Sequence, residues 1–128
     1  MSGISYLFDT SAVLYFLHQP KQLQDNSSSV FVSFVNELEL LSYSKLSSKE
    51  EKAIKHFLKL VDLINIDQEI KSMTITLRQK YTLKLPDAII CATAMVHKLS
   101  LVTNDLKLHK ISEITCCHLG DITEDIHP

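Results

Sequence analysis

The stretch from Lys84 to Asp105, KLPDAIICATAMVHKLSLVTND, constrains the fold more than any other part of the chain. Between Ala88 and Val96 the only polar residue is Thr93, so a helix formed here is apolar nearly all round. Pro86 suits the first turn of such a helix, where its missing N–H is not needed. The sequence therefore predicts a helix that is buried inside the protein rather than lying on its surface.

An acidic residue stands near each end of this stretch. Asp87 falls in the first turn of the predicted helix, where the helix dipole favours a negative charge. Ser100–Val102 is predicted to be a short inner strand, and Thr103, Asn104 and Asp105 follow it. In open α/β sheets, ligand sites form beyond the carboxyl ends of the strands. Both acids are therefore candidates for a functional site.

The rest of the chain alternates short apolar segments with amphipathic ones. Strands are predicted at residues 4–8, 30–32, 63–66 and 111–117. Helices are predicted to begin at capping residues, which are Thr10 or Ser11, Ser33, Ser48 with Glu51 in capping-box spacing, and Asp67. Residues 22–29 are predicted to be a loop and residues 119–128 a polar tail. The alternation favours an α/β fold with a parallel sheet, and one domain over residues 1–128.

Charge and cysteine content narrow the setting. The net charge is -2 and Arg78 is the only arginine, so any contact with nucleic acid has to come from local lysines. The three cysteines, Cys91, Cys116 and Cys117, have no C-x-x-C spacing, which favours a reducing compartment. No apolar run reaches the roughly 18 residues that span a bilayer, and no signal-peptide pattern opens the chain. We therefore expect a soluble, cytoplasmic protein without a membrane partner.

Several common sites are excluded by the residues present. Glycine occurs only at positions 3 and 120, which rules out a P-loop and a dinucleotide-binding loop. The six histidines form no H-E-x-x-H motif, and no Cys/His set has zinc spacing. The segment Asp9-Thr10-Ser11 lacks the second aspartate of a phosphatase-type D-x-D pair, which argues against an aspartyl-phosphate mechanism.

What remains is a set of acids at the ends of predicted elements. Asp9 follows the first strand and Asp105 a later one, so they share one edge if those strands are parallel neighbours. Asp87 and a glutamate near residue 38 could reach the same place. Carboxylates about 5 Å apart repel by about 3 kcal/mol per pair at an effective dielectric of 20. A hard ion such as Mg²⁺ or Mn²⁺ relieves that repulsion and can activate a water, as in a metal-dependent nuclease.

Three segments of the chain resemble the PIN-domain family, and more narrowly the VapC-like toxins of type II toxin–antitoxin systems. They are YLFDTSAVLYFL, FVSFVNELELLSY and LKLPDAIICATAMVHKLSLVTND, and they occur in the order found in the family. Together they leave only local spacers and the terminal tail uncovered. The resemblance implies a three-layer α/β/α fold with a central, mainly parallel sheet. It also implies a metal-dependent endoribonuclease that hydrolyses RNA phosphodiesters with a metal-activated water.

The family's four acids carry over to this chain residue by residue. Asp9 matches the first acid, Asp87 the acid that opens the apolar helix, and Asp105 the acid of the T-N-D motif. Counting from Ser33 assigns the remaining acid to Glu39, with Glu37 as the alternative. Those two lie about 200° apart on a helix, so they cannot both face one site. The resemblance makes Asp9, Glu39, Asp87 and Asp105 the catalytic and metal-binding residues, with Mg²⁺ or Mn²⁺ as the cofactor.

Neighbouring polar residues have supporting roles in the same family. Thr10, Ser11, Thr103 and Asn104 match positions that hydrogen-bond the acids. Lys80, Lys84 and Lys107 flank the acidic segments and are candidates for RNA contacts. Many relatives have asparagine where this chain has Ser11, and the acidic–aromatic pair usual after the T-N-D motif is missing at residues 106–108. The sequence therefore does not determine how Ser11 hydrogen-bonds the acids, nor whether residues 106–108 contact the substrate.

Other interpretations of the same residues stay open. Each acid has a structural alternative, with Asp9 and Asp105 as helix caps, Asp87 as a charge that the dipole favours, and Glu39 as a solvated side chain. The chain could also be a catalytically silent binding module in a regulatory complex, or a PIN nuclease of RNA processing or DNA repair that needs no antitoxin. Expected partners are an RNA substrate, a cognate antitoxin protein and a second copy of the chain. The RNA target and the number of metal ions do not follow from the sequence.

Overall fold

A five-stranded parallel sheet forms the centre of the computed structural model, which describes residues 3–19 and 21–126. The strands run in the order β4-β3-β1-β5-β6, and Leu7 of β1 pairs with Phe31 of β3 and Leu101 of β5. The bounds are β1 Ser5–Phe8, β3 Ser29–Ser33, β4 Asp62–Ile64, β5 Ser100–Val102 and β6 Cys116–Cys117. The predicted parallel α/β fold is confirmed.

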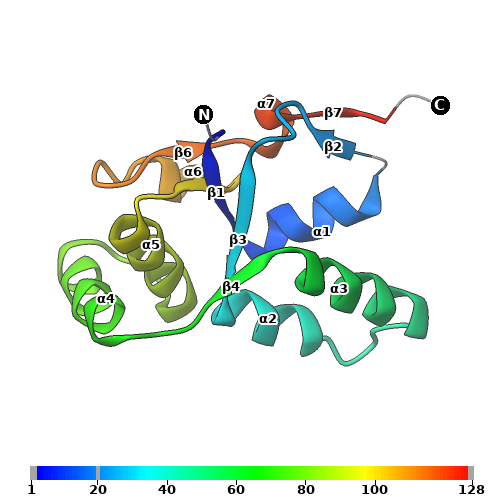
Figure 1. The fold of residues 1–128 in the computed structure, drawn as a ribbon. Coiled ribbons are helices and arrows are strands. Elements are labelled where there is room, and N and C mark those ends of the chain that lie inside the picture. Colours follow the sequence, from blue (N-terminus) through cyan, green and yellow to red (C-terminus); the bar gives the residue numbers. More distant parts are fainter. Residues whose placement is uncertain (1–2, 20, 127–128) are drawn as a thin grey trace.

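Helices cover both faces of this sheet, as Figure 1 shows. Leu7 packs with α4 (Gln68–Lys80) and α5 (Leu85–His97) in one apolar core. Its neighbours Tyr6 and Phe8 point to the opposite face, where they pack with α1 (Thr10–His18) and α3 (Ser48–Leu60). This alternation is the two-residue period of a strand that is buried on both faces. The three-layer α/β/α arrangement is therefore confirmed.

The apolar helix at the centre of the sequence argument is α5, and it is buried as predicted. Every residue from Ala88 to Ala94 is buried. The hydroxyl of Thr93 donates a hydrogen bond to the carbonyl of Ile89 at 2.7 Å, which satisfies the one polar side chain in that run. The helix ends at Lys98, whose left-handed backbone (φ 55°) forms the C-cap. Because α4 packs along α5, the first turn of α5 is held at one edge of the sheet.

The remaining helices begin close to the predicted positions, with two corrections. Asp9 caps α1 in place of Thr10 or Ser11, because its own carboxylate accepts from the backbone N–H of Ala12. The capping box of α3 uses Ser47 and Glu50, one residue before the predicted pair, and Ser33 and Asp67 cap α2 (Phe34–Leu41) and α4 as predicted. Two short helices, α6 (Leu106–His109) and α7 (Leu119–Ile122), complete the set in the described residues.

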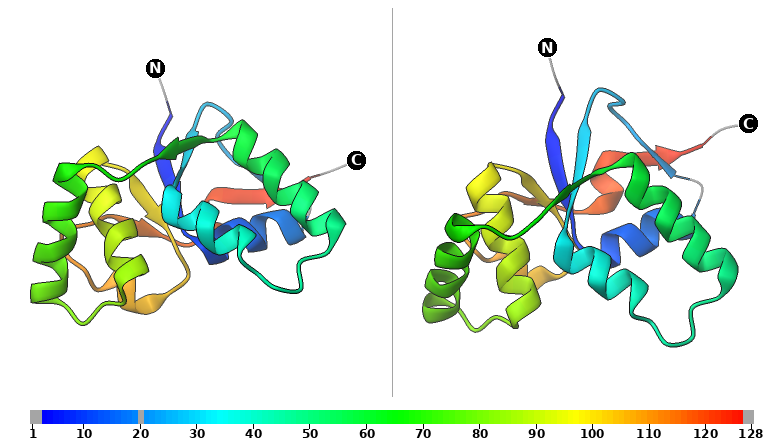
Figure 2. Two further views of the ribbon diagram at one scale, coloured as in Figure 1. Left: turned by 90° about the horizontal axis from the view of Figure 1, so that it is seen from below. Right: turned by 60° about the horizontal axis from the view of Figure 1, so that its bottom comes forward.

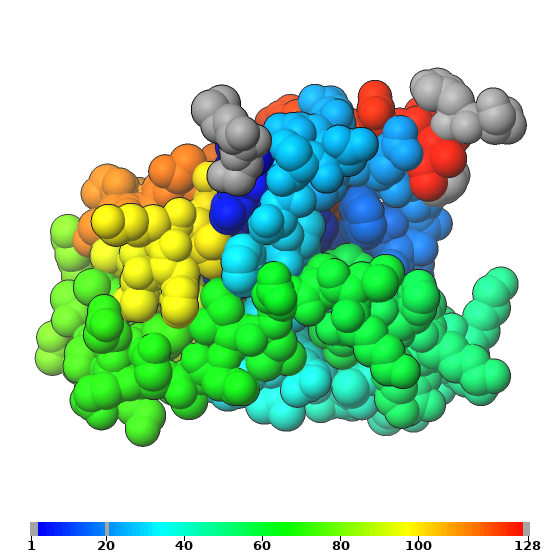
Figure 3. Space-filling view, in the orientation of Figure 1, coloured from blue at the N-terminus to red at the C-terminus, as the bar shows by residue number. Residues whose placement is uncertain are grey.

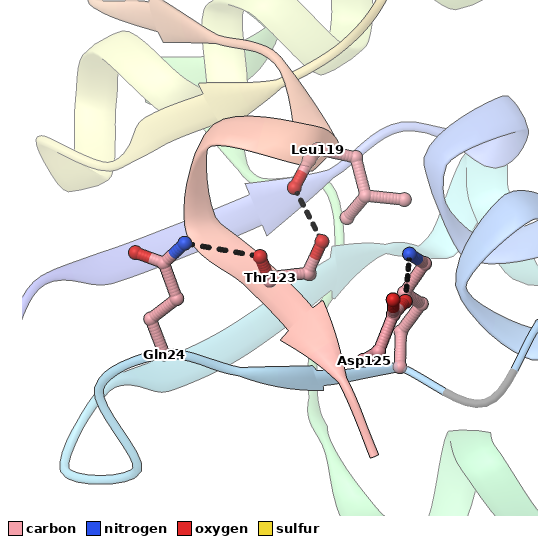
Figure 4. A network of polar contacts seen from close by, with 5 residues as sticks. Gln24, Leu119, Thr123 and Asp125 are labelled. Atoms are coloured by element: carbon pink, nitrogen blue, oxygen red, sulfur yellow. Dashed lines mark hydrogen bonds and ion pairs between the residues drawn. The ribbon is translucent and has the colours of Figure 1, made fainter. Parts of the chain in front are cut away.

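The C-terminal segment is not the polar tail that the sequence predicts. Residues 119–125 form α7 and β7 (Thr123–Asp125), and β7 pairs antiparallel with β2 (Lys21–Leu23). Part of the predicted loop at residues 22–29 is therefore a strand. Figure 4 shows the contacts that hold this second sheet, including the amide of Gln24 on the carbonyl of Thr123 and the hydroxyl of Thr123 on the carbonyl of Leu119. Residues 127 and 128 lie outside the described residues.

The last strand of the main sheet is shorter than predicted. Cys116 and Cys117 pair with β5, and the carbonyl of Thr115 accepts from the N–H of Leu101, whereas the residues before Thr115 make turns, with the N–H of Ile111 on the carbonyl of Leu108 and the N–H of Ile114 on the carbonyl of Ile111. Figure 3 shows one face of the molecule in a space-filling view, with the green segment from α3 to α4 running across its lower part. Among the described residues, no helix combines the length and the apolar character needed to cross a bilayer.

Candidate active site

The four predicted acids line one cavity of about 350 Å³ at the carboxyl edge of the sheet. Each comes from a different element: Asp9 follows β1, Glu39 lies in α2, Asp87 in the first turn of α5, and Asp105 follows β5. At this edge α2 contacts both α1 and α5, as Figure 2 shows from below. The described residues that line the cavity are Asp9, Thr10, Ser11, Tyr15, Glu39, Asp87, Ile90, Asn104 and Asp105.

Asp9 is the most enclosed of these acids. One carboxylate oxygen accepts from the N–H of Ala12 at 2.8 Å and so caps α1, and the hydroxyl of Thr103 also donates to this carboxylate. Burial raises the pKa of Asp9, against these two hydrogen bonds, and the charges of Asp105 and Glu39 raise it further. Asp9 thus caps a helix and also faces other acids, so its structural alternative explains only part of its position.

Helix capping does not explain the position of Asp87, because no side chain forms a capping hydrogen bond at the N-terminus of α5. Its carboxyl is half-buried, and burial raises its pKa. The charges of Asp105, Glu39 and Asp9 raise that pKa further, whereas the charge of Lys84 lowers it. The ionised form of Asp87 is therefore disfavoured by the same acids that surround the cavity. This is the electrostatic situation in which a bound cation is stabilising.

Asp105 sits at the exposed rim of the cavity and caps α6. Its carboxylate accepts from the N–H of Lys107 at 3.0 Å, and its own N–H donates to the hydroxyl of Thr103 at 3.0 Å. Thr103 is wholly buried and bonds both Asp9 and Asp105, one by its hydroxyl hydrogen and the other by its hydroxyl oxygen. Thr103 therefore fixes the two acids relative to each other.

Glu39, and not Glu37, is the glutamate that lines the cavity in the described residues. Its carboxylate accepts from the hydroxyl of Thr10 at 2.6 Å. The same hydroxyl accepts from the amide of Asn36 at 3.1 Å, and the amide oxygen of Asn36 accepts from the N–H of Ser33 at 2.7 Å. This chain of bonds begins at the N-terminus of α2 and ends at Glu39. It orients the glutamate toward the cavity.

Asn36 is a further residue of the site, which the sequence motifs above do not include although the sequence carries a signal for it. It stands three residues after the cap Ser33, where an asparagine can complete a capping box, and its side chain is wholly buried. A buried amide needs partners for both its oxygen and its nitrogen. The first is the N–H of Ser33 and the second is Thr10. The residue is therefore part of the site as well as of the helix cap.

Two histidines hold the loop that carries Asp105. A ring nitrogen of His109 bonds the carbonyl of Thr103 at 2.7 Å, and His118 bonds the side-chain oxygen of Asn104 at 3.3 Å. The two rings stack with their centroids 4.4 Å apart. The sequence alone does not predict this pair, because residues 109 and 118 belong to different elements. Asn104 lines the cavity while its oxygen also accepts from the N–H of Leu119 at 3.3 Å.

The three candidate lysines do not line the cavity. The ammonium of Lys80 forms an ion pair with Glu113 at 2.9 Å and lies outside the cavity lining. Hydrogen bonds from the hydroxyl of Tyr81, the larger effect, and from Lys80 lower the pKa of Glu113 to about 2. Lys84 and Lys107 are exposed, and Lys84 acts on the site by lowering the pKa of Asp87. Among the described residues the cavity lining includes no lysine or arginine.

The side chains of the cavity fit a hard divalent cation in their chemistry. The polar groups that face it are carboxylate, hydroxyl and amide oxygens, which suit Mg²⁺ or Mn²⁺ and disfavour zinc. Across residues 3–19 and 21–126, no three His, Cys, Asp or Glu side chains stand close enough to hold one ion together. Mg²⁺ keeps several waters and needs only one or two carboxylates, so the acids fit an ion that remains largely hydrated.

A Thr10→Val substitution tests the bond between α1 and Glu39. We expect the affinity of the cavity for Mn²⁺ to fall by about 10–100-fold, since residues that orient metal ligands have effects of this size. The free energy of unfolding should fall by about 1–3 kcal/mol, because the buried amide of Asn36 loses its acceptor. Thr76→Val in α4 is the matched control, as that hydroxyl bonds only the carbonyl of Ser72. Equal Mn²⁺ affinity in both variants would contradict a role for Thr10.

Comparisons with known proteins identify the fold independently of the site. The family model described as PIN domain matches residues 6–114. A toxin–antitoxin complex from Klebsiella pneumoniae contains a chain that is 28% identical, with a TM-score of 0.67, over 94% of this chain and 99% of that chain. No curated protein sequence matches this chain.

Two further solved structures are similar in fold. VapBC2 from Rickettsia felis, bound to a DNA fragment from its promoter, has a TM-score of 0.74 at 18% identity, over 90% of this chain and 98% of that chain. VapBC-1 from nontypeable Haemophilus influenzae has a TM-score of 0.73 at 19% identity, over 91% of this chain and 99% of that chain. At these identities the likeness is one of fold.

Proposed function

The chain belongs to the PIN domain family, and from that premise we propose that it is a metal-dependent endoribonuclease, the toxin of a toxin–antitoxin pair. The observation that carries the proposal is the meeting of Asp9, Glu39, Asp87 and Asp105 at one cavity. Burial and the neighbouring acids raise the pKa of Asp9 and Asp87, so their ionised forms are costly to the fold, and such clusters are typical of functional sites.

In this scheme Asp9, Glu39, Asp87 and Asp105 would surround a largely hydrated Mg²⁺ or Mn²⁺ at the end of β1, with one or two carboxylates bound directly and the others acting through its waters. When bound, such an ion would act as a Lewis acid on the phosphodiester and would lower the pKa of a water molecule that attacks the phosphorus. Thr10 keeps Glu39 turned toward the cavity, and Thr103 keeps Asp9 and Asp105 at a fixed separation. Because these supports are hydrogen-bonded before any ligand arrives, the site is preorganised for the reaction.

The proposal is tested by incubating the protein with single-stranded RNA, paired RNA and single-stranded DNA. Each substrate is tested with Mg²⁺, with Mn²⁺ and with a chelator. Asp105→Asn serves to exclude a contaminating nuclease, since asparagine can still cap α6 at Lys107. We expect metal-dependent cleavage of RNA by the unchanged protein and none by the variant. No cleavage of any RNA would favour the catalytically silent module, and cleavage of DNA alone would favour a repair nuclease.

We further propose an antitoxin protein as partner, in the cytoplasm where both would act. An apolar groove of about 620 Å³ lies between α1, the α2–α3 loop and α3, lined in part by Leu14, Leu17, Leu46 and Ile54. A groove of this kind accepts the apolar face of a helix. The proposal is supported by the similar chains, which come from VapBC and other toxin–antitoxin complexes.

Ala53→Arg tests the groove as the antitoxin site. Ala53 is exposed and lines the groove, so arginine adds bulk and charge there without entering the core. Co-expressed with the product of the adjacent reading frame, the variant should lose co-purification while keeping its unfolding temperature. His56→Arg, on the same helix and outside the groove lining, is the control and should bind normally. Equal binding by both variants would remove the groove from the proposal.

A second copy of the chain is also a proposed partner. Leu38 of α2 and Leu60 of α3 are large apolar side chains that the fold leaves exposed. Exposed apolar surface of this kind is typical of association sites when it is contiguous. Light scattering over a concentration series measures the mass directly. A dimer is expected, and a strict monomer at the highest concentration would contradict it.

A further inference from the structure

The cavity has an unusual balance of charge for a site that receives a polyanion. Its described lining contains the four acids and no lysine or arginine. The phosphates of a strand are therefore repelled by the walls wherever a cation does not neutralise them. Inside the cavity, contacts with the nucleotides beside the reacting phosphate then come from groups that do not depend on charge. Apart from hydroxyls and an amide, the lining offers Tyr15 and Ile90.

Tyr15 is placed as a free aromatic surface at this cavity. It lies on α1 four residues after Ser11, so the two side chains share one face of the helix. Its side chain is 57% exposed. Phe16, the next residue, instead packs against the core, with its ring 5.8 Å from that of Phe8 and 6.1 Å from that of Phe57. The helix therefore packs one aromatic residue against the core and presents the other to the cavity.

We propose that the ring of Tyr15 stacks on an unpaired base next to the phosphate held at the acids. The inference rests on the proposed nuclease function and names how that site binds its substrate. Stacking suits this position because every base has a flat apolar face and the interaction does not require a positive charge. A base in a duplex already stacks on its neighbours, so the ring selects single-stranded nucleic acid. Tyr15 thus acts as a positioning residue for the reacting nucleotide.

Three variants separate stacking from other roles of Tyr15. Tyr15→Phe keeps the ring and removes only the hydroxyl, whereas Tyr15→Leu keeps an apolar side chain and removes the ring. Ile75→Ala is the control, because Ile75 is 60% exposed on α4 and lies outside the cavity lining. With a short single-stranded oligoribonucleotide and Mg²⁺ or Mn²⁺, KM should rise about 10-fold or more for Tyr15→Leu and stay unchanged for the other two.

A spectroscopic measurement detects the stacking directly. The probe is the same oligoribonucleotide with one 2-aminopurine, moved along the strand, and the protein carries Asp105→Asn so that the probe survives. At one position of the probe, binding should quench the fluorescence, and Tyr15→Leu should remove that quenching while Tyr15→Phe keeps it. A structural role alone would change the unfolding temperature and would not follow the presence of a ring.

The outcomes distinguish this inference from the function on which it rests. If the unchanged protein cleaves no RNA with either metal, the proposed function fails, and the fluorescence series still tests the stacking. If it cleaves RNA, but Tyr15→Leu has an unchanged KM and an unchanged fluorescence response, the function stands and the stacking role is overturned. If Tyr15→Leu raises KM and removes the fluorescence quenching, and Tyr15→Phe keeps the KM and the quenching of the unchanged protein, the inference is supported.

Discussion

Replacing Asp9 with asparagine is expected to lower metal-dependent RNA cleavage by at least about 100-fold and to raise the unfolding temperature of the metal-free protein. The loss follows because residues that merely support metal ligands already have effects of about 10–100-fold. The gain in stability follows because burial and the charges of Asp105 and Glu39 disfavour the ionised carboxylate. Asparagine has a similar shape, can still cap α1 at Ala12, and carries no charge.

The stability gain should depend on pH in a defined direction. Burial raises the pKa of both Asp9 and Asp87 above the ordinary value of 3.8, so the folded state favours their protonated forms. Their contribution to stability is fully present below that ordinary value, and it is lost as the pH rises through the raised pKa. At neutral pH, Asp9→Asn should therefore unfold at a higher temperature than the unchanged protein. The difference between the two unfolding temperatures should shrink toward pH 4.

Thermal unfolding with added chelator measures this, and Asp67→Asn is the matched control. Asp67 caps α4 with the same kind of bond, to the N–H of Ile70 at 2.9 Å, but lies outside the cavity lining. The control should keep full activity and show no gain in stability. Undiminished cleavage by Asp9→Asn would contradict the role of Asp9 in the site. A lower unfolding temperature at neutral pH would contradict the repulsion among the acids.

Mn²⁺ should stabilise the unchanged protein by about 2.7 kcal/mol at a concentration one hundred times its dissociation constant. For a domain of this size, that corresponds to a rise of roughly 10 °C in the unfolding temperature. The rise should shrink as the pH falls, because protons compete with the ion for the carboxylates.

A matched pair of glutamates makes this experiment specific. Glu39→Gln should reduce the Mn²⁺-induced rise, because Glu39 lines the cavity and bonds Thr10. Glu37→Gln, two residues away on the same helix, should leave the rise unchanged, since Glu37 is outside the described lining. Equal effects of the two substitutions would mean that Mn²⁺ stabilises the protein through surface charge. No rise in the unchanged protein would contradict metal binding at this cavity.

The parts that the sequence predicts well are those fixed by local pattern. The apolar run from Ala88 to Val96 admits only a buried helix, and α5 is that helix. The strands before Asp9 and Asp105 are short apolar segments, and parallel pairing of β1 with β5 brings their ends together. The choice of Glu39 over Glu37 rested on family spacing. Its bond to Thr10 has a local origin in the capping box of α2.

The parts that escaped prediction depend on contacts between distant residues. The strand β7 pairs with β2 across about a hundred residues, and neither three-residue segment has enough apolar alternation to be recognised alone. The stacked rings of His109 and His118 meet only because β6 returns beside β5. In the sequence, Tyr15 is one of several apolar residues of an amphipathic helix. Only the position of α1 beside α2 shows that its side chain lies at the cavity.

The central claim is that the acids of this cavity hold a divalent cation, and a crystal structure of the protein grown with Mn²⁺ tests it most directly. Anomalous scattering should place Mn²⁺ in the cavity, at about 2.1 Å from carboxylate oxygens of at least two of Asp9, Asp87 and Asp105. Mn²⁺ bound only elsewhere on the protein, with these carboxylates bonded solely to protein groups and water, would contradict the account.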